Sequence, residues 1–97
     1  MNVNIQAIHF EIADRLVEFV NKKAQRLAKH FPDISDFDVN LRLIKPEAAM
    51  NKECIMRITI PGYDTMAATK EADTFEEAVD LCLEALERPI EKIKARR

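Results

Sequence analysis

Polar and apolar residues alternate along four stretches of the chain, with the period of two that is typical of strands buried on one face. The alternation is regular over residues 2–8, 37–43 and 54–60. It returns over residues 63–70, where small alanine and threonine side chains replace larger apolar ones. The dipeptide Pro61-Gly62 between the last two stretches predicts a tight turn. We therefore expect four strands, each with one buried and one solvated face.

Two further stretches have the period of an amphipathic helix. Between residues 12 and 31 the apolar side chains fall within one arc at about 100° per residue, and Pro32 is expected to end this helix. A second apolar stripe runs from residue 75 to residue 93, and Thr74-Phe75-Glu76-Glu77 has the pattern of a capping box at its start. Because Pro89 lies inside this stripe and lacks a backbone donor, we expect a kink or a second helical segment there.

The order strand, helix, three strands, helix predicts an α+β fold of the β-α-β-β-β-α type, formed as a single domain over residues 1–97. A helix between the first two strands favours a parallel pair with a right-handed crossover. The short links between the later strands favour antiparallel pairing. These rules predict a four-stranded mixed sheet with both helices on its apolar face. They also make the two helices parallel, so that their C-terminal halves lie at the same end of the domain.

The composition excludes several classes of protein. Gly62 is the one glycine among 97 residues, so the chain lacks the glycine-rich loops of nucleotide-binding folds. Cys54 and Cys82 lie far apart in the chain with no histidine nearby, so we expect buried, reduced thiols, no metal site and no cofactor. No apolar run approaches the roughly 18 residues of a membrane span, and no signal-like segment begins the chain. We therefore expect a cytoplasmic protein without membrane contact.

The charges are unevenly distributed, although 15 basic and 17 acidic residues leave a formal net charge of only -2. Residues 22–29 contain four bases and no acid, and residues 88–97 contain five bases and one acid. Residues 64–87, in contrast, contain eight acids and one base. Because both basic segments occupy the C-terminal halves of predicted helices, they should meet at one end of the domain. A nearly neutral chain would then carry a basic pole, which is the kind of surface that neutralises nucleic-acid phosphates.

Each of these charge patterns also has a structural interpretation. A run of charges can be a solvated helix face, and bases near a helix C-terminus complement the helix dipole. Lys23 falls within the apolar stripe, so either its stem snorkels along the core or its ammonium projects into the gap between the helices and meets a phosphate. We expect the acids of the second helix on its solvent side, with Arg88 and Lys92 on an adjacent flank. These acids are Glu76, Glu77, Asp80, Glu84, Glu87 and Glu91.

Catalysis has little support in the sequence. His9 and His30 lie at the edges of predicted elements, without an evident nucleophile or carboxylate partner. The paired carboxylates Glu76 and Glu77 are accounted for by the capping box and the helix dipole. We therefore expect no enzymatic activity and no small-molecule substrate.

Several short groups of residues occur in a characteristic order. They are His9-Phe10-Glu11-Ile12 and Lys22-Lys23 in the first half, and Ile60-Pro61-Gly62 and Thr74-Phe75-Glu76-Glu77-Ala78 in the second. With this spacing the chain resembles the ribosome hibernation promoting factor family, which also covers the ribosome-associated inhibitor once described as a sigma-54 modulation protein. The resemblance covers essentially the whole chain. It looks like the short form, because longer members continue into a dimerisation domain.

The resemblance implies a fold like that of double-stranded-RNA-binding domains, and binding to the small ribosomal subunit in the channel used by mRNA and tRNA. Family members occupy the decoding region in stationary phase or starvation and thereby inhibit translation. Their contacts go mainly to ribosomal RNA phosphates, without reading a base sequence. The residues that match the contacting bases are Lys22, Lys23, Arg26 and Lys29 in the first helix and Arg88, Lys92 and Lys94 in the second.

The chain departs from the family pattern at two places. Ala13 stands at the first helix cap, where members commonly have threonine, and Pro89 and Glu91 interrupt the usually basic end of the second helix. The second departure lies among the three predicted contact residues of that helix, which are Arg88, Lys92 and Lys94. An alternative function is a protein-interaction module, in which the acidic second helix or the open sheet face binds a basic protein partner. Co-sedimentation with ribosomes would distinguish the two functions.

Overall fold

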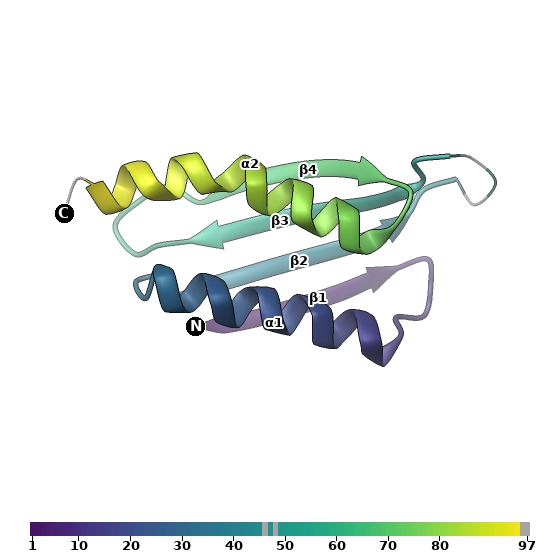
Figure 1. The fold of residues 1–97 in the computed structure, drawn as a ribbon, viewed down its shortest axis with the longest axis horizontal. Helices are drawn as coiled ribbons and strands as arrows, with labels where there is room; N and C mark the ends of the chain where they lie inside the picture. Colours follow the sequence, from purple (N-terminus) through teal and green to yellow (C-terminus); the bar gives the residue numbers. More distant parts are fainter. Residues whose placement is uncertain (46, 48, 96–97) are drawn as a thin grey trace.

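Six elements follow one another in the computed structural model, which describes residues 1–45, 47 and 49–95 (Figure 1). Their order confirms the predicted β-α-β-β-β-α arrangement. The strands are β1 (Asn2–Ile8), β2 (Asp36–Leu43), β3 (Lys52–Thr59) and β4 (Met66–Ala72), and the helices are α1 (Asp14–His30) and α2 (Phe75–Ala95).

The strands form one sheet in the order β1-β2-β3-β4, with β1 parallel to β2 and the other neighbours antiparallel. The helix α1 makes the crossover between the two parallel strands, and α2 follows β4. In Figure 1 both helices lie in front of the sheet, and both end on the left, the side of the N-terminus. The predicted mixed sheet, with two parallel helices on one face, is therefore confirmed.

The hydrophobic core lies between the sheet and the two helices. In β2 and β3 every second side chain points into this core, and the strands face each other in register, with Val39 opposite Met56. The completely buried side chains of the sheet are Phe37, Val39, Leu41, Cys54, Met56, Ile58 and Ala72. The helix α2 contributes six buried residues and α1 only three, so α2 is the more deeply embedded of the two.

The strand β1 lies at an edge of the sheet and has no fully buried side chain. On the face away from the helices, the side-chain amide of Asn2 donates a hydrogen bond to the carboxylate of Asp36, at 3.3 Å. The amide of Asn4 does the same to Asp38, at 2.8 Å. The open face of the sheet is therefore polar along β1 and β2, as the alternation predicts.

The ends of the helices follow the local sequence. The helix α1 ends before Pro32, where the Phe31 N–H still donates to the Leu27 carbonyl at 2.9 Å. Its N-cap, Ala13, makes no side-chain hydrogen bond. At the start of α2 the Thr74 hydroxyl oxygen accepts a hydrogen bond from the Glu77 N–H at 3.1 Å, which is the first half of the predicted capping box.

The bounds of the fourth strand differ from the prediction. That strand is predicted over residues 63–70, but β4 spans Met66–Ala72. The predicted tight turn forms at Pro61-Gly62, where the Tyr63 N–H donates to the Ile60 carbonyl at 3.1 Å and Gly62 adopts a φ of 89°, but the pairing with β3 begins only at Met66. Pairing with β3 then continues as far as Ala72, which lies opposite Lys52.

The second helical segment considered at Pro89 does not form, because α2 continues without interruption from Phe75 to Ala95. Pro89 cannot donate to the carbonyl of Ala85. Ala85 is exposed, however, so water can satisfy that carbonyl. The next residue, Ile90, is only 1% exposed, so burial of the apolar stripe continues beyond the proline. Tertiary packing therefore outweighs the local preference here.

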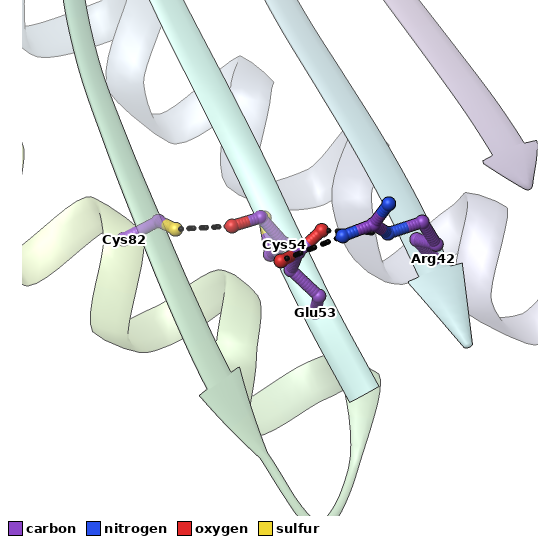
Figure 2. Close-up of polar contacts among 4 residues, drawn as sticks. All are labelled: Arg42, Glu53, Cys54 and Cys82. Carbon is purple, nitrogen blue, oxygen red and sulfur yellow. Dashed lines mark hydrogen bonds and ion pairs between the residues drawn. The ribbon is translucent and has the colours of Figure 1, made fainter. Parts of the chain in front are cut away.

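The two cysteines meet where α2 packs on the sheet (Figure 2). The Cys82 thiol donates to the Cys54 carbonyl at 3.3 Å, and both thiols are buried and free, as predicted. Hydrogen bonding to Cys82 and burial raise the pKa of the Cys54 thiol. The adjacent residue Glu53 forms an ion pair with Arg42 of β2, with Oε1 3.0 Å from Nε. The cysteine hydrogen bond joins β3 to α2, and the ion pair joins β3 to β2. Both contacts therefore have a structural role.

Candidate nucleic-acid interface

Three bases of α1 point into solvent along one side of the helix. Lys22, Arg26 and Lys29 are all exposed, and their spacing of four and then three residues places them one above another on the helix surface. We call these three residues the basic face of α1. Within residues 1–45, 47 and 49–95 none of the three forms an ion pair. Their charges are therefore available to an external anion.

Lys23 is held between the two helices. Its Nζ lies 3.0 Å from Oδ1 of Asp80 on α2, and 5.1 Å from the centre of the Phe19 ring. The side chain of Lys23 is 25% exposed and that of Asp80 is 50% exposed. The ammonium therefore projects into the gap between the helices, as one of the two interpretations of Lys23 expects, while its contact with a phosphate stays a prediction. In this structure, however, the ammonium meets a carboxylate.

A cleft of about 320 Å³ separates the two helices. Lys23 and Arg26 lie on its α1 wall, and apolar side chains such as Leu27 and Leu83 also line it. The α2 wall carries three carboxylates that we call the acidic row, namely Asp80, Glu84 and Glu87. These acids are exposed, as predicted, but they also face α1, because the side of α2 that carries them is turned toward the cleft.

The C-terminal ends of the helices converge, as the predicted topology requires. Nζ of Lys94 donates to the carbonyl of His30 at 3.4 Å and lies 5.2 Å from the centre of the Phe31 ring. Lys94 therefore contacts the end of α1 at His30, the residue that follows Lys29 in the chain. Arg96 and Arg97, which belong to the second basic segment, lie outside the described residues.

Arg88 and Lys92 lie on a different side of α2. At about 100° per residue they are rotated roughly 80° and 120° from Asp80, beyond Glu84 and away from α1. Both are exposed, and neither lines the cleft. The predicted contact residues therefore form two groups, with the acidic row between them: the bases of α1 together with Lys94, and Arg88 with Lys92.

Some residues that shape this surface are not evident from the sequence. Phe19 lies four positions before Lys23, so their cation–π contact follows from helical spacing. The pairing of Lys23 with Asp80, in contrast, depends on how the two helices are aligned on the sheet. Lys70 of β4 lines a hollow with Leu81, Glu84 and Ala85 of α2. It adds a base near the outer flank of α2.

Other kinds of site have little support in the described part of the chain. Within it no group of three or more histidine, cysteine, aspartate or glutamate side chains is placed to hold a metal ion. None of its helices is both long enough and apolar enough to cross a membrane. The exposed bases are therefore the feature of the described residues that most clearly points to a ligand.

A mixed sheet covered on one face by two parallel helices, with exposed bases along one of them, defines a class of small domains that can neutralise phosphates. Within that class, the chain belongs to the family described as sigma 54 modulation protein / S30EA ribosomal protein, whose model matches residues 3–97. The family resemblance found in the sequence is thereby confirmed.

Similar curated proteins are ribosome hibernation factors. The chain is 31% identical over 97 residues to the ribosome hibernation promotion factor of Bacillus subtilis strain 168, a match that covers 99% of this chain and 50% of that protein. It is 28% identical over 94 residues to the ribosome hibernation promoting factor of Pseudomonas putida strain KT2440, covering 97% of this chain and 87% of that protein. The chain thus spans half the length of the Bacillus subtilis relative and most of the Pseudomonas putida one.

Solved structures share the fold over nearly the whole chain. A ribosomal subunit interface protein from Coxiella burnetii superposes with a TM-score of 0.83 at 26% identity, covering 98% of this chain and 99% of that one. The N-terminal domain of Thermus thermophilus Protein Y gives a TM-score of 0.76 at 21% identity, covering 96% and 99%. The second likeness shows the fold alone.

Proposed function

We propose that the protein is a ribosome hibernation factor, which binds the small ribosomal subunit in the channel used by mRNA and tRNA and inhibits translation in stationary phase or starvation. The observation that carries the proposal is membership of the family, combined with the exposed basic face of α1. The names of the Bacillus subtilis and Pseudomonas putida relatives support the hibernation role. The name of the Coxiella burnetii structure supports a place at the ribosomal subunit interface.

Binding would rest on phosphate neutralisation by positively charged side chains. Lys22, Arg26 and Lys29 present their charges along about two turns of α1, a spacing that can follow one RNA backbone. Lys94 extends this group at the converging helix ends. Arg88 and Lys92, on the far side of the acidic row, would contact a separate stretch of RNA. Such contacts position the protein by shape and charge without reading bases.

In this proposal the protein acts by occupying space, so it needs no catalytic group, cofactor or metal ion. A domain lodged in the channel excludes mRNA and tRNA sterically for as long as it stays bound. The ribosome also fixes the place of action in the cytoplasm. The affinity should fall steeply with salt, because each phosphate contact releases condensed counterions.

The alternative, a module that binds a basic protein through the acidic helix, is less well supported. The acidic row faces α1, and Asp80 is already paired with Lys23 at 3.0 Å. A basic protein partner would have to displace that lysine, whereas the bases on the basic face of α1 have no such partner within the described residues. The structure therefore favours an anionic ligand.

Sedimentation of starved-cell lysates through sucrose gradients tests the proposal. At low salt the protein should travel with small subunits or whole ribosomes, and raised salt should release it. The double variant Lys22→Glu/Arg26→Glu should remain folded but lose this association, and the slope of log affinity against log salt should fall by about 1 for each lost phosphate contact. A wild-type protein that stays in the soluble fraction at low salt would refute the hibernation function.

A matched control places the same charge change elsewhere. The double variant Lys45→Glu/Arg57→Glu also reverses two exposed bases, one after β2 and one on β3, away from the cleft. It should sediment with ribosomes like the wild type. Equal loss of binding in both variants would show that net charge matters and that α1 is not the contact surface.

A further inference from the structure

The acidic row is unexpected beside a surface that binds RNA. Phosphates approaching the cleft from solvent meet the carboxylates of Asp80, Glu84 and Glu87 as well as the bases of α1. One of these carboxylates, on Asp80, is in direct contact with Lys23. Within residues 1–45, 47 and 49–95, Lys23 is the one base of α1 that has a carboxylate partner. Within that same part of the chain, Lys23 must release a carboxylate before it binds phosphate, whereas the other bases of α1 need not.

We propose that Asp80 competes with RNA phosphate for Lys23, so that Lys23 exchanges the carboxylate for a phosphate when the protein binds RNA. The pair then acts as an autoinhibitory contact that lowers the affinity of α1 for RNA. The biological ligand in this inference, ribosomal RNA, rests on the proposed function. The competition itself concerns only the two side chains and any RNA phosphate at the cleft.

The geometry permits such an exchange. The Asp80 side chain is 50% exposed, so water can solvate its carboxylate after Lys23 leaves. The stem of Lys23 runs past Phe19, with Nζ 5.1 Å from the ring centre, so the ammonium stays near the cleft whichever anion it contacts. The ion pair is partly open to solvent and is therefore weak enough to be broken by a placed phosphate.

The size of the effect follows from the exposure of the pair. Partly exposed ion pairs change an equilibrium by about two- to five-fold. Removal of the carboxylate in Asp80→Asn should therefore tighten binding to RNA by roughly that factor. The dependence of affinity on salt should change little, because Lys23 contacts phosphate in the complexes of both proteins.

The experiment measures the affinity of the full chain for two probes, purified small ribosomal subunits and single-stranded poly(U), at several salt concentrations. Asp80→Asn is compared with Glu77→Gln, which removes one negative charge from the first turn of α2, at an exposed residue that does not line the cleft. Asp80→Asn should bind both probes more tightly than Glu77→Gln does. Equal affinities in the two variants would overturn the proposal, because they would leave only an effect of net charge.

A double-mutant cycle with Lys23→Met isolates the exchange, since methionine retains a flexible apolar side chain but removes the ammonium. The gain from Asp80→Asn should disappear in the Lys23→Met background. If the gain persists there, Asp80 repels RNA without acting through Lys23, and the proposal is wrong. The poly(U) measurements decide this even if the wild type fails to bind ribosomal subunits, which would refute the proposed function alone.

Discussion

Replacing Pro89 by alanine should stabilise the protein, although a proline is the residue removed. In α2 the proline lacks the N–H that would bond to the Ala85 carbonyl, and its ring crowds the preceding turn. The helix nevertheless continues to Ala95, with Ile90 buried one position later. The packing of the last turns therefore offsets a local strain that Pro89→Ala would remove.

The expected gain follows from three contributions. Alanine is favoured over proline in a helix interior by about 3 kcal/mol. Proline restricts the unfolded chain, so its replacement stabilises the unfolded state by about 0.4–1 kcal/mol. Pro89 is half-buried, and loss of its ring contacts costs on the order of 1 kcal/mol. The net stabilisation is roughly 1–2 kcal/mol, which corresponds to a rise in Tm of about 4–16 °C for a domain of this length.

Thermal and urea unfolding, followed by circular dichroism at 222 nm, measure this difference. The control is Glu91→Ala, an exposed position two residues further along α2, which should change stability by less than about 0.5 kcal/mol. An unchanged or lower stability of Pro89→Ala would refute the reasoning. It would mean that contacts of the proline ring outweigh the missing hydrogen bond.

Three further predictions concern the core, the cap and the thiols. Leu86→Ala removes a side chain that is 3% exposed and should cost about 2–5 kcal/mol in urea unfolding. Thr74→Ala removes the oxygen that accepts from the Glu77 N–H and should lower the Tm by the equivalent of about 1 kcal/mol. Hydrogen bonding to Cys82 and burial raise the pKa of Cys54, so ionisation of this thiol favours the unfolded chain. The contribution of this thiol to stability should be complete below about pH 8.5 and be lost above it, whereas hydrogen bonding to Cys54 lowers the pKa of Cys82 and acts in the opposite direction; in urea unfolding at a series of pH values, Cys54→Ala should remove the loss that Cys54 causes.

The sheet could be predicted closely because its central strands are buried on one face only. In β2 and β3 the side-chain period of two coincides with burial, so Val39 and Met56 mark the core face. The bounds of β4 were harder to predict, because its inward side chains include the small Ala68 and Ala72. Whether α2 continues past Pro89 or restarts there was left open by the sequence for another reason. It depends on the surface that receives Ile90, which a local pattern does not contain.

One part of the candidate interface could also be predicted, because it depends only on the local periodicity of the sequence. The basic face of α1 follows from helical spacing and needs no knowledge of the rest of the fold. The pair between Lys23 and Asp80 joins two helices that are far apart in the sequence, and its geometry depends on their alignment on the sheet. The separation of Arg88 from the bases of α1 likewise depends on which side of α2 faces α1.

The placement of β1 at the edge of the sheet has a consequence for dynamics. The strand β1 has no buried residue and α1 has three, whereas α2 is anchored by six. Amide hydrogens of β1 and α1 should therefore exchange with solvent faster than those of β3 and α2. Because α1 also carries the exposed bases, a bound polyanion would stabilise this N-terminal part preferentially. Binding of RNA should therefore slow amide exchange most in residues 2–30, where exchange in the free protein is fastest.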